Sequence, residues 1–197
     1  EGTLTITDEM EASTSRHFSL NVTTRMWRVV WEETRVSYTW DGYLEQGNTW
    51  AGIHEPGEGG RLLAVNATLT LAMDLLPTQL PQDNFTLKLA VPTSAWNEEH
   101  ATSQEDPTKE PKAYLERQEM NSVPDAERIY DADDREQLRM LLLDETVGRY
   151  GQGNWTWQVT ADQADPDLID EFDPDEGNDW VLEVEFVILT PRITEVV

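Results

Sequence analysis

The sequence contains no cysteine, so disulfides, thiolate catalysis and cysteine-ligated zinc are excluded. Lysine is nearly absent as well, with only Lys88, Lys109 and Lys112. Together, 14 Lys and Arg face 39 Asp and Glu, which gives a net charge of −25. Because such a field repels phosphate groups, we expect no binding to nucleic acid.

Long apolar runs are also missing. No stretch reaches the roughly 20 residues that a transmembrane helix requires, and the chain opens without a basic signal-peptide region. We expect membrane attachment only through an anchor outside this sequence. Excess carboxylate with little lysine is typical of proteins that stay hydrated in high salt. This favours a halophilic, archaeal source; an ordinary acidic surface domain is the alternative.

Known catalytic motifs are also missing from the sequence. His17, His54 and His100 occur singly, without metal-binding spacing. The chain has no nucleophile elbow, no phosphate-binding P-loop and no dinucleotide fingerprint. The many carboxylates single out no glycosidase-like pair. The sequence therefore predicts that the protein is not an enzyme.

What the sequence does contain is period-two alternation. In Gly153–Leu189, Trp155 and Trp157 share one face of a first expected strand, and Trp180 and Phe186 share one face of a second. This pattern is typical of half-buried antiparallel strands. We expect the two to form a final hairpin around an acidic loop at residues 161–179.

Similar alternation predicts further strands over residues 3–7, 17–23, 27–31, 35–40, 43–46, 63–73 and 85–91. The dipeptide Asp41-Gly42 predicts a tight turn between two of these strands. Residues 93–125 are polar and are expected to form a long excursion. A helix is expected near residues 134–147, because leucines recur at helical spacing and Asp133 precedes Glu136 by three residues, as in a capping box.

No segment alternates strands with helices, so a parallel sheet is not expected. We predict a mainly β protein: one antiparallel β-sandwich over residues 1–197, of jelly-roll or immunoglobulin-like type, with one inserted helix.

Four glycosylation sequons are present, and all use threonine. Their acceptors are Asn21, Asn66, Asn84 and Asn154. In each, the apolar middle residue has the inward phase, so the asparagine is expected to face solvent, as a glycan requires. The sequons predict an extracellular glycoprotein. The alternative is that Asn-apolar-Thr is ordinary strand alternation.

Eight tryptophans occur, and six share the phase of their apolar neighbours, which predicts core positions. Trp50 and Trp96 lie in loop-like sequence and are the candidate ligand-binding residues, because exposed indoles can stack on sugars.

The loop at 161–179 is the candidate cation site. Carboxylates at Asp165, Asp167, Asp170, Asp173 and Asp175 are the ligand type that Ca²⁺ prefers. The spacing is not that of an EF-hand, and solvated surface carboxylates explain it equally well. No other cofactor is predicted.

These features favour a non-enzymatic, secreted or surface-displayed structural or adhesive protein, part of a pilus, fibre or surface layer. We expect protein partners and self-assembly through sheet edges, with residues 3–7 or 192–197 as an added strand. A jelly-roll capsid or spike protein of a virus of a halophilic host is one alternative. A carbohydrate-binding module is the second.

Overall fold

The computed structural model describes residues 2–19, 25–57, 59–73, 83–104, 108–143, 149–163 and 177–196. The protein is mainly β, with one α-helix, and every strand pairing is antiparallel. Its elements are β1 (Gly2–Thr7), β2 (Ser13–Phe18), β3 (Arg25–Glu45), β4 (Thr49–His54), β5 (Arg61–Leu71), β6 (Asn84–Val91), the 3-10 turn η1 (Pro92–Ser94), β7 (Trp96–Ala101), β8 (Lys112–Arg117), β9 (Glu127–Ala132), α1 (Arg135–Leu142), β10 (Trp155–Gln163) and β11 (Gly177–Val196). No helix in the described ranges is long and apolar enough to cross a bilayer.

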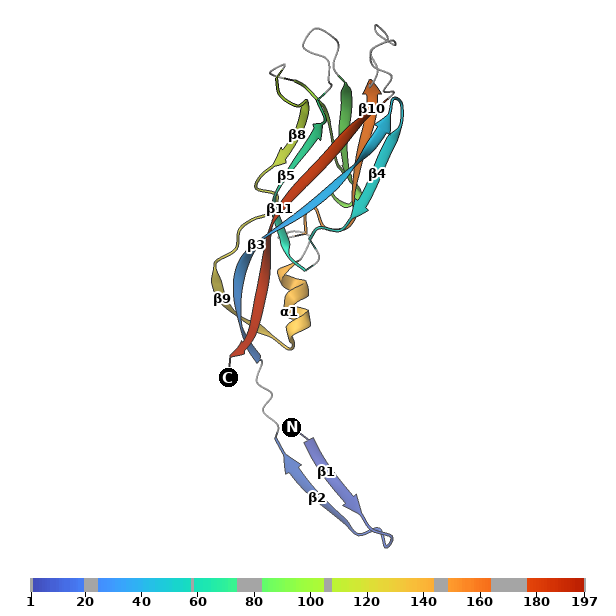
Figure 1. Ribbon diagram of the computed structural model, residues 1–197. Helices are drawn as coiled ribbons and strands as arrows, with labels where there is room; N and C mark the ends of the chain where they lie inside the picture. Colours follow the sequence, from blue (N-terminus) through green and yellow to red (C-terminus); the bar gives the residue numbers. More distant parts are fainter. Residues whose placement is uncertain are drawn as a thin grey trace.

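Two long strands, β3 and β11, form the backbone of the larger sheet, whose order is β8-β5-β11-β3-β9. They pair without interruption from Gly177↔Glu45 to Val196↔Met26 (Figure 1). The predicted turn at Asp41-Gly42 is wrong, because both residues lie inside β3. Gly42 pairs directly with Trp180, and the indole packs over the glycine, with the Trp180 ring 3.4 Å from where a Cβ would lie.

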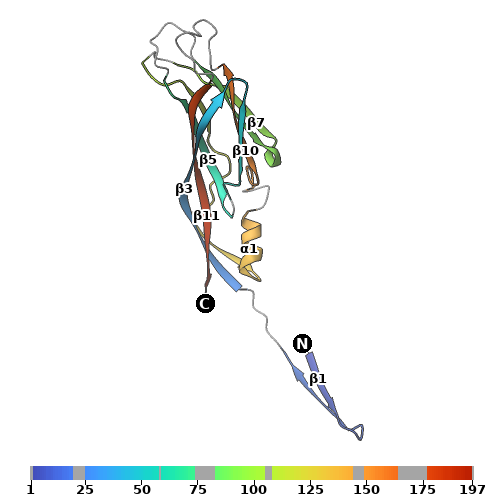
Figure 2. The same cartoon turned by 45° about the vertical axis from the view of Figure 1, so that its right-hand side comes forward.

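The smaller sheet has the order β4-β10-β6-β7. Its inward side chains and those of the larger sheet form one hydrophobic cluster, in which the rings of Trp155 and Phe186 meet edge to face at 5.0 Å. Figure 2 shows β10 and β7 on one side and β3, β5 and β11 on the other. The predicted final hairpin is therefore wrong: β10 and β11 belong to different sheets, although both are strands with the predicted inward faces.

A second hydrophobic cluster lies where α1 covers the other half of the β3–β11 ladder. It contains seven buried residues: Trp27, Val29, Trp31, Leu138, Leu142, Leu189 and Ile193. Buried Arg61 completes it, because its guanidinium donates to the carbonyl oxygens of Leu142 and Ser122 and lies 4.7 Å from the Trp31 ring centroid. Burial lowers the pKa of Arg61, and the coulombic effect of Tyr130 partly offsets this.

The predicted helix is confirmed over Arg135–Leu142, while residues 144–147 lie outside the described ranges. Its N-cap is one residue later than expected. The Asp134 carboxylate accepts from the backbone N–H of Gln137 at 2.7 Å, whereas the backbone N–H of Asp133 donates to Gln137 Oε1 at 3.3 Å.

The predicted polar excursion at 93–125 is wrong in part, since it contains η1, β7 and β8. β7 completes the smaller sheet beside β6, and β8 completes the larger sheet beside β5. Ser103 and Lys112 join the two strands by a bridge. The strand β7 was missed because its sequence is mostly polar, and the strand predictions rest on alternating apolar residues.

The N-terminal strands form a third, separate sheet. β1 pairs with β2 from Gly2↔Phe18 to Thr7↔Ser13, and the Asp8 carboxylate accepts from the backbone N–H groups of Met10 and Ala12 in the turn. β1 matches the strand expected at 3–7. The strand expected at 17–23 begins earlier, at Ser13, and its residues 20–23 lie outside the described ranges.

Candidate functional site

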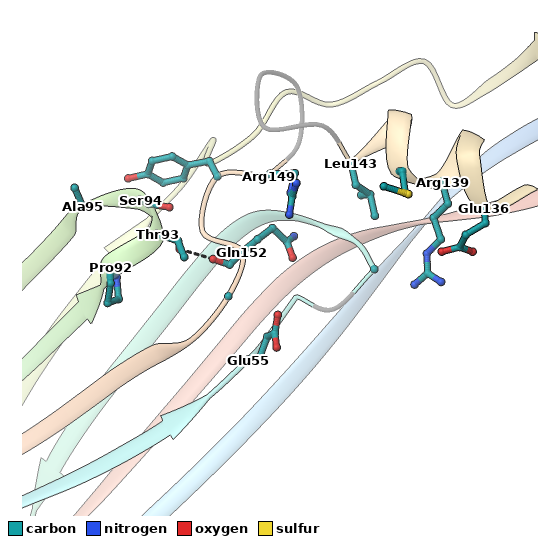
Figure 3. A pocket seen from close by; sticks show the side chains of 14 residues that line it. Glu55, Pro92, Thr93, Ser94, Ala95, Glu136, Arg139, Leu143, Arg149 and Gln152 are labelled. Atoms are coloured by element: carbon teal, nitrogen blue, oxygen red, sulfur yellow. Dashed lines mark hydrogen bonds between the residues drawn. The ribbon is translucent and has the colours of Figure 1, made fainter. Parts of the chain in front are cut away.

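A cavity of about 770 Å³ opens between α1 and the ends of the smaller sheet. Three segments distant in the sequence build it: the turn after β4, the 92–95 turn between β6 and β7, and residues 149–153 before β10. The fourth wall is α1 itself. Figure 3 shows Arg149 and Glu55 pointing into this space from opposite sides, with Arg139 reaching toward it from the helix.

Side-chain hydrogen bonds to backbone atoms fix the loops of this cavity. The backbone N–H of Gly151 donates to Ser94 Oγ at 2.7 Å, and Thr93 donates to the carbonyl oxygen of Gln152. The Gln152 amide in turn donates to the carbonyl oxygen of Gly60. The walls are thus tied to both sheets before any ligand binds, which lowers the ordering cost of binding.

Tyr150 forms part of the floor, and it is held from two sides. The Asn121 side chain accepts from the backbone N–H of Tyr150 at 3.1 Å and donates to the carbonyl oxygen of Tyr150 at 2.9 Å. The guanidinium of Arg117 lies 4.9 Å from the phenol ring centroid. The ring therefore has a fixed place at the cavity.

Among the described residues, four charged side chains line the cavity: Glu55, Glu136, Arg139 and Arg149. Within the described ranges none of these four takes part in an ion pair, whereas every ion pair found there has a glutamate as its acid. Gly59 makes room for one of them. It has φ +79°, and a Cβ there would lie 2.0 Å from Arg139 Nη2.

The described lining of this cavity offers charged and polar groups that can hold a ligand. The lining has two fixed-charge guanidiniums, two carboxylates, hydroxyls and one amide, but no histidine, lysine or serine–base pair. Within the described ranges no group of three His, Asp or Glu side chains is placed to hold a metal ion. The predicted Ca²⁺ ligands Asp165, Asp167, Asp170, Asp173 and Asp175 lie outside those ranges.

A cluster of aromatic side chains lies at the edge of the core, on β3 and β4. Tyr38, Trp40 and Trp50 are half-buried there around His54, whose ring centroid is 4.4 Å from that of Tyr38 and 5.1 Å from that of Trp40. Both ring nitrogens of His54 are buried and lack a hydrogen-bond partner in the described structure. Desolvation lowers the pKa of His54 to about 4.

The two predicted ligand-binding tryptophans do not form an exposed stacking surface. Trp96 is 6 % exposed and packs edge to face on Trp155, with Arg117 over its ring. Trp50 lies in β4, half-buried, with its ring centroid 4.9 Å from that of Trp180. Both tryptophans therefore contribute to packing, and neither lines the cavity.

The sequon asparagines differ in access. Asn66 is exposed on the outer face of β5, between Glu185 and Glu116, and Asn154 is exposed just before β10. Asn84 is half-buried, and the threonine of its sequon, Thr86, donates to Asp162. Asn21 lies outside the described ranges. Attachment of a glycan at any of them stays a prediction.

Sequence reasoning missed the cavity altogether. Its charged residues come from positions 55, 136, 139 and 149, and no local spacing connects them. No protein-family model and no curated protein sequence matches the chain. Its function is therefore inferred from the geometry above.

Proposed function

We propose that this protein is a non-enzymatic, surface-displayed structural or adhesive protein whose copies assemble by adding strands to one another's sheet edges. In this proposal the two facing sheets are a β-sandwich of jelly-roll or immunoglobulin-like type. The exposed sequons Asn66 and Asn154 support display outside the cell, and the acidic composition supports a high-salt environment.

One observation carries the proposal: the β1–β2 hairpin leaves an apolar face uncovered. Leu4, Ile6 and Phe18 lie on that face, together with the cross-strand partners Arg16 and Thr14, and are 59 %, 64 % and 47 % exposed. The opposite face is polar and knit by side-chain hydrogen bonds between Thr3 and His17 and between Thr5 and Ser15. A two-stranded hairpin alone is marginally stable in water, so this face is suited to covering by another surface.

The described structure offers a matching acceptor on β3. Within the described ranges β9 pairs only with Arg25–Val30, so β3 has an open edge from Glu32 to Glu45. Along it Val36, Tyr38 and Trp40 face inward and are half-buried, while Arg35, Ser37 and Thr39 face outward and are exposed.

β1 has the same alternation, with Leu4 and Ile6 on one face and Thr3, Thr5 and Thr7 on the other. Added to the β3 edge, β1 places its apolar side chains over the half-buried aromatics and its threonines in water. Main-chain hydrogen bonds supply affinity in such an addition, and the side-chain pattern supplies specificity.

The occupant of the edge at Tyr38 and Trp40 is a second copy, because the hairpin of the same chain is too short to reach those two residues. Residues 19–25 span at most about 20 Å, and the hairpin from Ser19 to the level of Ile6 adds about 17 Å. Trp40 lies about 50 Å along β3 from Arg25. A contact of this head-to-tail kind is heterologous, and it builds a filament where its rotation does not close into a ring.

We expect the protein to sediment as concentration-dependent oligomers in molar KCl. The double variant L4K/I6K, which charges the apolar face, is expected to remain monomeric. The matched control T3K/T5K adds the same charge to the polar face and is expected to assemble. Analytical ultracentrifugation from about 1 to 200 μM checks this; a wild-type monomer throughout, or equal behaviour of both variants, contradicts the proposal.

Cross-linking tests the acceptor edge directly, because the chain has no native cysteine. Thr5→Cys protein mixed with Ser37→Cys or Thr39→Cys protein is expected to give mixed disulfide dimers under mild oxidation. Thr5→Cys mixed with Glu98→Cys, on the distant β7, serves as the control. Equal yields from the β3 and β7 positions would contradict β3 as the acceptor.

The carbohydrate-binding alternative that relies on Trp50 and Trp96 is disfavoured by the packing of both side chains.

A further inference from the structure

The charged cavity beside α1 has no place in the assembly described above, because the hairpin and the β3 edge do not line it. Its volume of about 770 Å³ lies in the range of sites that bind small molecules. Arg139 and Arg149 line it without a carboxylate partner in the described ranges. From this combination we propose that the cavity binds an acidic saccharide, with the two arginines holding its carboxylate.

The arginines are suited to this role by both charge and geometry. A guanidinium is always charged at neutral pH and presents parallel N–H donors that match a planar carboxylate. Arg139 comes from the helix and Arg149 from the loop before β10, so the two enter from different elements, as Figure 3 shows. A protein with a net charge of −25 repels anions from most of its surface. Two guanidiniums at one cavity, without an ion-pair partner among the described residues, therefore make a local site for an anion.

The rest of the lining fits hydroxyl groups. The carboxylates of Glu55 and Glu136 and the side-chain amide oxygen of Gln152 can accept hydrogen bonds. The lining also includes the hydroxyl of Thr93. The Tyr150 ring, Pro92 and Leu143 add apolar surface, against which the carbon face of a sugar ring can pack. The ligand thus needs a carboxylate for the two arginines and several hydroxyls for the rest of the lining.

These same carboxylates argue against an acidic peptide as the occupant. An acidic peptide has no hydroxyls to offer Glu55 and Glu136, so it would place further carboxylates against them. Like charges at such distances repel, and no lysine lies in the lining to offset them. A saccharide with one carboxylate per ring or fewer meets the arginines with its acid and the glutamates with its hydroxyls.

Gly59 is the positioning residue for this site. Its positive φ and missing side chain leave the space in which the Arg139 guanidinium lies, with Nη2 2.0 Å from the position of a would-be Cβ. Gly59→Ala is therefore expected to push Arg139 out of position and to weaken binding of the acid without removing either charge.

Calorimetry of the intact chain at one fixed salt concentration tests the site. The probes are trigalacturonate, the neutral trisaccharide maltotriose and inorganic sulfate. We expect trigalacturonate to bind at least tenfold more tightly than either of the others. The double variant R139Q/R149Q is expected to weaken trigalacturonate binding at least tenfold, and Gly59→Ala at least threefold.

Arg135→Gln is the matched control, because it removes the same charge from an exposed position on α1 that does not line the cavity. It is expected to change affinity less than twofold. The NMR signals of the arginine Nε–H groups provide a second readout: those of Arg139 and Arg149 are expected to shift with trigalacturonate, and that of Arg135 is not.

Absent binding of trigalacturonate, equal binding of maltotriose, or an unaffected R139Q/R149Q variant overturns the proposal. Sulfate binding as tight as trigalacturonate overturns the saccharide part and leaves a simple anion site. The assembly state of R139Q/R149Q is expected to match that of the wild type, so failure of this inference and failure of the assembly proposal are separate results.

Discussion

The same two strands, β3 and β11, pass through two very different environments. In one half of their ladder they are covered by a second sheet, and a cluster that counts 22 buried members among the described residues fills the space between. In the other half they are covered by one helix of eight residues, and the cluster counts seven buried members in the same part of the chain. A continuous hydrogen-bond ladder thus does not imply uniform stability, because side-chain burial differs along it.

The two halves also differ in how they handle polar groups. The half beneath α1 depends on a buried guanidinium that satisfies the carbonyl oxygen of Leu142 near the end of the helix. The sheet-covered half instead tolerates unsatisfied nitrogens on His54, Trp157 and Trp180 among its rings. Its greater apolar burial can offset that cost, whereas the smaller cluster has less burial with which to offset an unpaired group.

The largest expected effect comes from the centre of the sheet-covered half. Phe186→Ala removes a fully buried ring that meets Trp155, Tyr38 and His54. We expect a loss of about 4 kcal/mol in the free energy of unfolding, measured by guanidinium chloride denaturation at fixed salt. Val181→Ala on the same strand, 38 % exposed, is the control and is expected to cost about 0.5 kcal/mol. Equal costs would mean that the two facing sheets do not share one core.

A smaller and more local effect is expected beneath the helix. Arg61→Met keeps the aliphatic stem and removes three donors, which leaves buried carbonyl oxygens without partners. We expect a loss of about 2–3 kcal/mol. Hydrogen exchange is expected to increase in residues 135–142 and 189–196 while residues 180–188 stay protected.

Arg28→Met is the matched control, because Arg28 makes an exposed ion pair with Glu127, which contributes at most about 1 kcal/mol. If Arg61→Met instead increased exchange equally along all of β11, the two halves would be one cooperative unit and the comparison above would fail.

The smallest expected effect is the loss of folding stability at acidic pH. His54 has a pKa of about 4 in the folded protein, lowered from 6.5 by desolvation. The unfolded chain therefore takes up this proton first, and stability is complete above about pH 6.5 and declines as the pH falls toward 4. Because the imidazole is partly exposed, we expect about 1–2 kcal/mol in total.

Denaturation at pH 7, 6 and 5 checks this, since most carboxylates remain ionised over that range. His54→Phe is expected to flatten the dependence, and His17→Gln on the exposed hairpin is expected to leave it unchanged. An unaltered slope in His54→Phe protein would show that His54 is not the responsible group.

Strand identity and strand face were predictable from the sequence because alternation reports burial directly. Trp155, Trp157 and Trp180 are buried as predicted. Strand partners were not predictable, because alternation gives a face and no neighbour; this is why β10 and β11 were wrongly paired. The Asp41-Gly42 dipeptide predicts a turn, whereas Gly42 lies inside β3 and accommodates the Trp180 ring from the opposite strand.

The cavity could not be predicted for a related reason. Its charged side chains come from a loop, a helix and a second loop, and only the folded chain brings them together. The apolar face of β1 was visible as alternation in the sequence. Its exposure was not, because alternation normally means that one face is covered.

The uninterrupted course of β3 has a mechanical consequence in the proposed filament. Tension from one neighbour enters at Arg25 through the hairpin, and tension from the next leaves at residues 36–40 of that strand. The pulling force then runs along the covalent bonds of β3. The hydrogen bonds between β3 and β11 do not have to resist it. Such a fibre would stretch or break at the joints between subunits before the subunits themselves began to unravel.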